Sequence, residues 1–341
     1  MNVSRAQRRQ CIWTASAILS LIGCLQVSPE ARSQQPGSPA QEPVNERVTR
    51  LILELDADLF SVREAAEEEL GEIGLPALNK IRDAARSHRS AEVRRRARRL
   101  VGRIEHQAVA EEFKQLAAQE DDSRIDVEQG MLLICRIVDP LVDQRKVTSE
   151  LDQFAAQVRE LLGKQVRPQD ADPQQAVKAL QQVLFVKHAL AGNRANYDNP
   201  ENSSLARVLE TRQGLPIILS HLAVAVGRRL DLPLVGLPVP GHYMLKYDGD
   251  QAPDTFAKQD IILDAYDAGR VISRQEVEEL ITRRGFKFDP QQHLQPSSNR
   301  AVLVRMLANL ASDYAEIGQV DKAQQVAGYR TMLEGEAEAA Q

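Results

Sequence analysis

The stretch that decides the fold of this chain reads Gln213-Gly214-Leu215-Pro216-Ile217-Ile218-Leu219-Ser220-His221, and a largely apolar run continues from it to Leu232-Pro233. Because proline fixes its own φ and has no N–H to satisfy, Pro216 suits the first turn of a helix. Beyond it, apolar residues recur every three or four positions: Leu219, Leu222, Ala223, Val226 and Leu230. Asp231 and Pro233 then end the pattern. The sequence therefore predicts a helix that begins at Pro216 and packs one face on a core.

Three short apolar runs follow this helix and are predicted to be strands. They cover residues 234–239, 243–247 and 261–263, and Pro240-Gly241 separates the first two. His242 and Asp264 stand at strand ends in this pattern. A buried helix followed by strands that carry one His and one Asp resembles the transglutaminase-like core of papain-type cysteine enzymes.

In that superfamily a cysteine opens the helix, a histidine activates the thiolate and an aspartate orients the imidazole. The position in this chain that matches the cysteine is Pro216, which carries no nucleophile. The resemblance implies that His242 and Asp264 are a remnant of a catalytic pair, now structural or ligand-binding. Such a pair can still bind, because a helix N-terminus favours anions and a histidine can donate to a carboxylate or carbonyl.

Several short motifs in one order resemble a narrower group, the SirB family of transglutaminase-like proteins. The motifs are Asn193, Tyr197, Pro200, Asn202-Ser203, Val208-Leu209, Arg212, Gly214-Leu215-Pro216 and Pro240-Gly241-His242. The resemblance extends upstream through residues 125–135, which are similar to the family's N-terminal helices. Downstream, residues 299–327 resemble its closing tetratricopeptide-like helix pair. Because the activity of family members is largely unassigned, the resemblance implies architecture more than function.

The fold class that follows is α+β and predominantly helical, with a central helix packed on a small antiparallel sheet. Leu, Ala and Val dominate and aromatic residues make up only 4% of the chain, which favours a mainly helical protein. We expect a signal peptide at 1–24, a disordered linker at 25–45, a HEAT-like helical module at 46–107, a SirB-type transglutaminase-like domain at 108–290 and a tetratricopeptide-like helix pair at 299–333.

The N-terminal segment predicts export to the periplasm or cell envelope. Three arginines precede an apolar run from Cys11 to Leu25, which is short for a membrane span and typical of a secretory signal peptide. Leu21-Ile22-Gly23-Cys24 resembles a lipobox, in which Cys24 would be acylated. Cleavage at Ala31-Arg32-Ser33 and an uncleaved anchor are the alternatives. We expect the protein to contact the membrane only through this N-terminal segment, by a lipid on Cys24 or by an uncleaved anchor. The Pro- and Gln-rich residues 34–43 would then be a tether.

The expected helical module carries two runs of opposite charge. Glutamates lie on one predicted helix, and eight arginines lie on a later stretch: Arg86, Arg89, Arg94, Arg95, Arg96, Arg98, Arg99 and Arg103. We interpret these runs as solvated faces that partly neutralise one another. The alternative is a docking surface for anionic lipid headgroups, cell-wall polymer or an acidic partner. The net charge of −5 argues against general nucleic-acid binding.

Two further hypotheses for the site stay open from sequence. Ser220 lies one helical turn after Pro216 and would be an unorthodox nucleophile, although a shift of about 5.4 Å would remove it from a fixed His242. A metal site from His242 with Asp264, Asp267 or His221 has no recognised ligand spacing, so neither a metal nor a cofactor is expected. Cys135 is expected to be buried and inert.

The candidate binding residues are Asn193, Tyr197, Asn202, Ser203, Pro216 and His221. Those in the polar loop would equally well fix that loop by hydrogen bonding to its backbone. The favoured function is a non-catalytic binding or scaffolding role in the cell envelope, with protein or peptide ligands near His242. The alternative is an amide-bond hydrolase or acyltransferase that uses Ser220 with His242 and Asp264.

Overall fold

The structure is a computed structural model that describes residues 42–163 and 166–335. The expected signal peptide, the lipidation site Cys24 and most of the expected linker at 25–45 lie outside the described residues. One correction concerns the end of that linker, because helix α1 (Val44–Glu54) already begins at Val44. Among the described residues, no helix combines the length and apolarity that crossing a bilayer requires.

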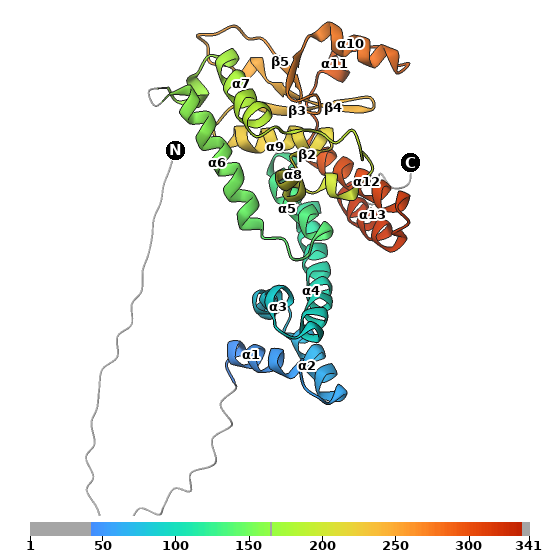
Figure 1. The fold of residues 1–341 in the computed structure, drawn as a ribbon. Helices are drawn as coiled ribbons and strands as arrows, with labels where there is room; N and C mark the ends of the chain where they lie inside the picture. The colour runs from blue at the N-terminus through green and yellow to red at the C-terminus, as the bar shows by residue number, and fades with distance from the viewer. Residues whose placement is uncertain (1–41, 164–165, 336–341) are drawn as a thin grey trace, which may run out of the picture. The chain divides into compact units, whose positions relative to one another are not determined.

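Four helices form the N-terminal module: α1, α2 (Phe60–Ile73), α3 (Leu75–Ser87) and α4 (Ala91–Ala117) (Figure 1). Gly74 joins α2 to α3 with a φ of +65°, a backbone conformation that glycine adopts without steric cost. Ser90 caps α4 by accepting a hydrogen bond from the backbone N–H of Val93. The buried apolar faces of the four helices meet in one core, which the periodicity of the sequence predicts.

Helix α4 crosses the expected boundary between residues 107 and 108. It runs without a break for 27 residues, so the module and the following domain share one helix. Val93, Ala97 and Leu100 belong to the core of the module. Val109 and Phe113, further along the same helix, belong to the core of the domain. The two cores are therefore joined by regular secondary structure and not by a linker.

A buried carboxylate ties this shared helix to its neighbours. Glu105 on α4 is 1% exposed and forms ion pairs with Arg82 on α3 and with Arg136 on α5 (Val127–Val138), whose Nε lies 2.7 Å from Oε2. Arg136 also bonds to Glu112 at 2.5 Å. Burial and the nearby charge of Arg136 lower the pKa of Arg82. The carboxylate of Glu105 thus links α4 to the helix before it in the chain, α3, and to the helix after it, α5.

The central helix α9 (Pro216–Arg228) begins where the sequence predicts, but its surroundings differ from the prediction. Every residue from Pro216 to Ala223 is buried, as are Ala225 to Gly227, while Val224 is half-buried and Arg228 at the end of the helix is exposed. The predicted apolar stripe is buried as expected, and burial extends to most of the other faces of the helix. A helix that is apolar all round must be covered on all sides, and here Ser220 and His221 lie in the interior as well.

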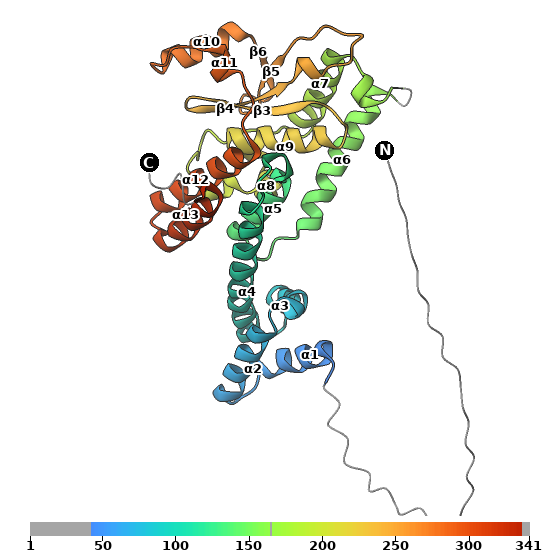
Figure 2. The ribbon, with the colours of Figure 1, turned by 180° about the vertical axis from the view of Figure 1, so that it is seen from behind.

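The covering of α9 comes from helices on one side and a sheet on the other (Figures 1 and 2). The helices of the domain are α5, α6 (Gln144–Leu162), α7 (Pro173–Gln181) and α8 (Leu205–Thr211), with a π-helical segment Gln182–Lys187. Short 3-10 turns occur at Asp122–Arg124, Pro168–Asp170, Pro200–Ser203 (η4) and Gly249–Gln251. Strands β1 (Ala191–Gly192) and β2 (Gln213–Gly214) form a small parallel pair directly before α9.

The main sheet is antiparallel and has the order β3 (Leu234–Val239), β4 (His242–Tyr247), β5 (Ile261–Asp264) and β6 (Arg270–Ile272). The first three strands confirm the prediction, whereas β6 was not predicted. One face of the sheet packs on α9. The other face buries a second small core beneath α10 (Arg274–Arg283), near α11 (Pro290–His293) (Figure 2). Ser273 and Glu276 form a capping box at the start of α10.

The chain closes with an antiparallel helix pair, α12 (Asn299–Glu316) and α13 (Val320–Glu334), joined at Gly318 with a φ of +75°. Helix α12 packs on α5 and α9, and α13 packs on α4. The predominantly helical α+β fold class is thereby confirmed. The individual domain boundaries stay a prediction, apart from the corrections at Val44 and along α4.

We expect Glu105→Gln to lower the free energy of unfolding by about 3 to 5 kcal/mol, because it leaves two guanidinium groups without their shared buried carboxylate. Urea denaturation followed by circular dichroism measures this change. The matched control is Glu111→Gln on the same helix, whose exposed pair with Lys114 should contribute about 0 to 1 kcal/mol. Equal losses in the two variants would contradict a linking role for Glu105.

Candidate functional site

His242 and Asp264 form a hydrogen-bonded pair at the ends of neighbouring strands. His242 opens β4 directly after the turn at Gly241, where φ is +66°, and Asp264 closes β5. The Nε2 atom of His242 lies 2.9 Å from Oδ2 of Asp264, and the two side chains are 11% and 13% exposed. The structure therefore brings together the two residues that the sequence singles out, at the edge of solvent.

Both oxygens of the Asp264 carboxylate form hydrogen bonds. Its Oδ1 accepts the backbone N–H groups of Tyr266 and Asp267 at 3.0 and 3.1 Å. Burial acts to raise the pKa of Asp264, but the hydrogen bond and charge of His242, with the two N–H groups, hold that pKa below its ordinary value. Asp264 thus stays ionised and fixes the orientation of the imidazole.

A short chain of hydrogen bonds places this pair beside the start of α9. Gly192 donates its N–H to the carbonyl of Tyr266 at 2.9 Å, and the Tyr266 hydroxyl donates to the carbonyl of Asn193 at 3.0 Å. Asn193 in turn donates its N–H to the carbonyl of Gly214, two residues before Pro216. A Cβ on Gly192 would lie 2.2 Å from the Tyr266 ring, so only glycine permits this contact. The pair thus lies at the N-terminal end of the central helix.

Two tyrosines form an aromatic group next to His242. The ring of Tyr266 stands edge-on to the His242 imidazole at 6.1 Å, and Tyr197 stands edge-on to Tyr266 at 6.1 Å. Tyr197 is 46% exposed, so this side of the site reaches solvent. Sequence reasoning missed Tyr266, although its position two residues after Asp264 was an available signal.

Two arginines on distant elements also reach this region, and no local pattern identifies them. Arg305 on α12 donates to the backbone carbonyl of His242 at 2.9 Å. Arg284, just after α10, donates to the carbonyl of Pro240 at 2.5 Å. Both side chains thus hold the β3–β4 turn that presents His242.

Ser220 and His221 lie in the interior and away from the pair. Ser220 is fully buried, and its Oγ has no hydrogen-bond partner in the described part of the chain. The Nε2 of His221 lies 2.9 Å from the Tyr243 hydroxyl, and burial lowers the pKa of His221 to about 3. The structure therefore does not bring Ser220 to His242, which a serine nucleophile would need, and it gives His221 a neutral structural role.

The asparagines of the loop before α8 bond to the loop itself. Asn193 donates its side-chain amide to Asn202 at 2.9 Å, and Asn202 donates to the carbonyls of Asn196 and Tyr197 at 2.6 and 2.9 Å. Asn202 and Ser203 are 4% and 1% exposed, and Pro216 is buried as well. Of the six candidate binding residues, Tyr197 alone is exposed in this structure.

The remaining candidates for chemistry are inert or incomplete in geometry. Cys135 on α5 is buried, its Sγ accepts the N–H of Ala206 at 3.3 Å, and burial raises the pKa of the thiol. Within 42–163 and 166–335, no three His, Cys, Asp or Glu side chains are grouped so that they could hold a metal ion. Asp267, a suggested ligand, pairs with Arg194 and Arg270.

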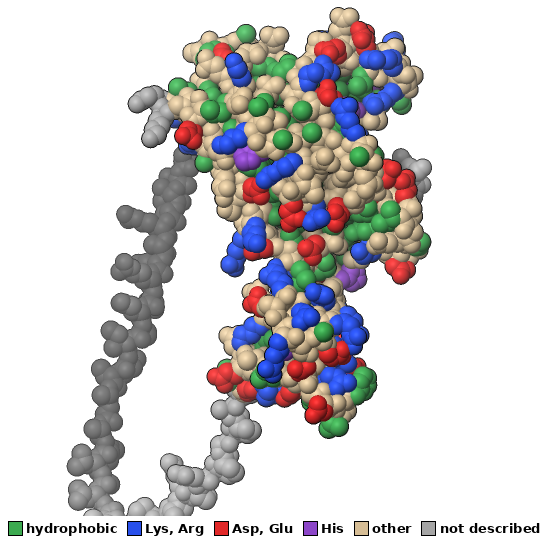
Figure 3. All heavy atoms as spheres, in the orientation of Figure 1, with side chains coloured by type: hydrophobic (Ala, Val, Ile, Leu, Met, Phe, Trp, Pro, Cys, Tyr) green, Lys and Arg blue, Asp and Glu red, His purple; other side chains and the backbone are tan. Residues whose placement is uncertain are grey.

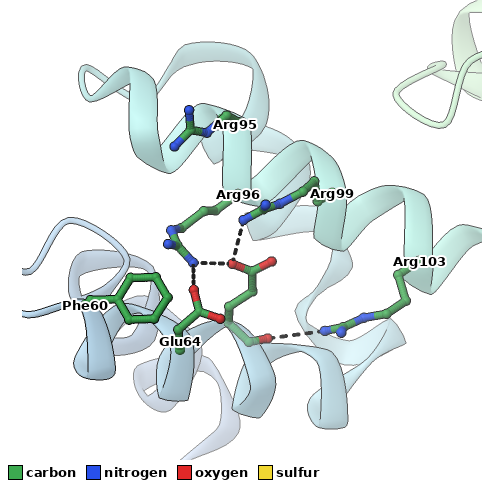
Figure 4. Close-up of a pocket in the computed structure, with 7 residues that line it drawn as sticks. Phe60, Glu64, Arg95, Arg96, Arg99 and Arg103 are labelled. Carbon is green, nitrogen blue, oxygen red and sulfur yellow. Dashed lines mark hydrogen bonds and ion pairs between the residues drawn. The ribbon is translucent and has the colours of Figure 1, made fainter.

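The charged runs of the N-terminal module neutralise one another in part, and positive and negative side chains alternate over its surface (Figure 3). Not all of these groups are solvated, which corrects the prediction. Arg96 is 4% exposed and bonds to Glu64, Glu67 and Glu92 at 2.5 to 2.6 Å. Arg96, Glu64 and Glu67 help to line a pocket of about 630 Å³ between α2 and α4 (Figure 4).

The native state keeps His221 neutral down to about pH 3, whereas the unfolded chain protonates His221 below its ordinary pKa of about 6.5. The stability that neutral His221 contributes is therefore fully present above pH 6.5 and is lost as the pH falls toward 3. The loss should be about 1.4 kcal/mol per pH unit. We expect His221→Gln, which retains a donor for Tyr243, to unfold in urea with a shallower dependence on pH between 6 and 4. His106→Gln, at an exposed position on α4, is the control. An unchanged slope in His221→Gln would contradict the neutral, buried state.

Comparison with known proteins places the pair within a recognised domain. A family model described as the transglutaminase-like superfamily matches residues 145–308, a range that contains α9, His242, Asp264 and Arg305. A UPF0162 protein of Xylella fastidiosa is 34% identical over 150 residues, which are 42% of this chain and 51% of the relative. A UPF0162 protein of Vibrio cholerae is 24% identical over 196 residues, which are 57% of this chain and 68% of the relative.

A eukaryotic relative is F-box only protein 21 of Mus musculus, with 31% identity over 144 residues, 40% of this chain and 22% of the relative. The chain spans about half the length of the Xylella proteins that it matches. No solved structure gives a significant match. The family model and the relatives together show that this chain contains a transglutaminase-like superfamily domain and has UPF0162 homologues.

Proposed function

We propose that the transglutaminase-like domain of this chain binds peptide-like ligands at His242 and Asp264 without forming a covalent intermediate. One observation carries the proposal. The imidazole of His242 is fixed by Asp264 at 2.9 Å, yet no hydroxyl or thiol in the described residues hydrogen-bonds to it. An oriented histidine without a nucleophile is suited to recognition and not to acyl transfer.

The residues that the structure describes offer no nucleophile in place of the cysteine that the resemblance implies. By its resemblance to papain-type enzymes, the helix would open on a cysteine where this chain has Pro216, a correspondence that we include in the proposal. Cys135 is buried with a raised pKa, and Ser220 is buried without a partner. The covalent step of an amide hydrolase or acyltransferase therefore lacks a group at this end of α9.

The same residues can recognise a peptide. Asp264 holds the Nε2 edge of the His242 ring, and the Nδ1 edge is left to hydrogen-bond with a polar group of a ligand. Tyr266 and the exposed Tyr197 provide ring surfaces that pack against a ligand's apolar groups. The site thus combines one oriented imidazole with a partly exposed aromatic group.

We further propose that the domain is of the SirB type and acts in the cell envelope as a binding or scaffolding protein. The ordered motifs from Asn193 to His242 support the first point. The basic and apolar pattern before residue 26 supports export, with Cys24 as a lipidation site. Protein or peptide components of the envelope are then the proposed ligands.

We expect the full chain, immobilised and incubated with a random peptide pool, to retain a subset of peptides intact. Asp264→Asn removes the charge that orients His242 and should weaken retention at least tenfold, which corresponds to about 1.4 kcal/mol. Mass spectrometry of the eluted peptides measures both retention and cleavage. Asp254→Asn, at a fully exposed side chain, is the matched control.

Two results would overturn the proposal. The first is a pool from which nothing is retained by the wild-type chain. The second is cleavage of peptides that disappears in both Ser220→Ala and His242→Ala, since that outcome requires a working serine nucleophile.

A further inference from the structure

Two arginines hold the turn before His242, and within the described residues both bond to backbone carbonyls and not to a carboxylate. Arg305 donates one hydrogen bond to the carbonyl of His242, and Arg284 donates one to the carbonyl of Pro240. No Asp or Glu in the described parts of the chain forms an ion pair with either guanidinium group. Since each guanidinium group has five N–H donors in a planar fork, most of their hydrogen-bonding capacity is left over.

Arg305 is also partly removed from water. Its side chain is half-buried, its guanidinium group lies 5.2 Å from the centre of the Tyr243 ring, and burial lowers its pKa. A desolvated charge without a counter-charge is costly to a folded protein. Such a charge beside a binding pair suggests that an anion from outside the chain completes it.

The arginines of the N-terminal module provide a contrast. In the pocket between α2 and α4, Arg96 and Arg99 bond to Glu67, and Arg103 bonds to a backbone carbonyl (Figure 4). Arg95 pairs with Glu92 on the same helix. That pocket supplies its own carboxylates. Bonding to backbone carbonyls alone is not unusual here, since Arg63, Arg94 and Arg103 do the same. Burial beside the Tyr243 ring, with no carboxylate of the described residues paired to it, is what distinguishes Arg305.

The two arginines act on the same part of the site as His242. The charges of both lower the pKa of the Tyr197 hydroxyl, against the larger effects of burial and of Asp313, which raise it. Asp313 and Asp198 also act on Tyr197, but neither forms an ion pair with Arg284 or Arg305. Positive charge and unused donors thus converge near the exposed tyrosine and the turn that presents His242.

We infer that Arg284 and Arg305 receive a carboxylate of the ligand, so that the site selects peptides that carry a free carboxylate near the residue contacting His242. This inference rests on the proposed binding function. This carboxylate can be the C-terminus of a peptide or the side chain of an Asp or Glu, since both present the same chemical group. A fork of guanidinium donors suits either, because carboxylates accept from arginine in bidentate geometry.

Three synthetic pools of N-acetylated peptides test the inference on the full chain. The first has a free C-terminus and no Asp or Glu, the second is C-terminally amidated and otherwise identical, and the third is amidated but contains Asp or Glu. We expect the first or third pool to be retained at least tenfold better than the second. The pool that is retained identifies the source of the carboxylate.

Variants separate recognition from a merely structural role of the arginines. Arg305→Gln and Arg284→Gln keep a donor for the backbone carbonyls and should each lower retention of the carboxylate pool about tenfold, while leaving the neutral pool unchanged. Loss of turn structure alone would lower all pools equally. Arg283→Gln, at the exposed neighbouring arginine of α10, is the control. If Arg305→Gln does not fold, Arg284→Gln, at an exposed position, is compared with the wild-type chain in its place.

The outcomes distinguish the inference from the function on which it rests. Equal retention of all three pools, with a loss only in Asp264→Asn, overturns the carboxylate inference and leaves the binding function standing. Absence of retention for every pool overturns both. Selective retention of a carboxylate pool that survives in Arg284→Gln and Arg305→Gln also overturns the assignment, because the anion would then be bound elsewhere.

Discussion

The burial of α9 over most of its length is the constraint on which the rest of the domain depends. A helix that is apolar on most of its faces can exist in water only if other elements cover those faces. Helices cover one side and the β3–β4 hairpin covers the other, so the sheet cannot shift without exposing apolar surface. His242 and Asp264 stand at the strand ends of that sheet, and the same packing that buries α9 therefore fixes the pair beside its first turn.

The polar residues within α9 show how such a helix is tolerated. His221 is accommodated by one hydrogen bond to Tyr243 and by staying neutral, which avoids the cost of a buried charge. Ser220 has no such partner, and a small hydroxyl costs less to bury than a charged group. Residues that look like catalytic candidates in a one-dimensional sequence are thus part of the packing of the domain.

Local sequence patterns predicted much of the fold, because caps, breaks and periodicity act within a few residues. The start of α9 at Pro216, the buried stripe of that helix and three of the four sheet strands are of this kind. His242 and Asp264 are 22 residues apart in sequence. Their pairing is consistent with the resemblance to the transglutaminase-like core. Arg284 and Arg305 could not be predicted, because their contacts join elements 44 and 63 residues apart and leave no repeating pattern. The sequence predicted the buried stripe of α9 but not the burial of most of its other faces, because that cover comes from distant elements.

The continuity of α4 has a consequence for how such a protein can be reassembled in evolution. A recombination breakpoint usually survives where few contacts cross it, in an exposed and flexible connector. A break at residue 107 would instead cut a regular helix between two hydrophobic cores and separate Glu105 from Arg136. The module and the domain should therefore be inherited together, and a relative that lacks the module and all of α4 would need another element to cover the part of the domain core where Val109 and Phe113 pack.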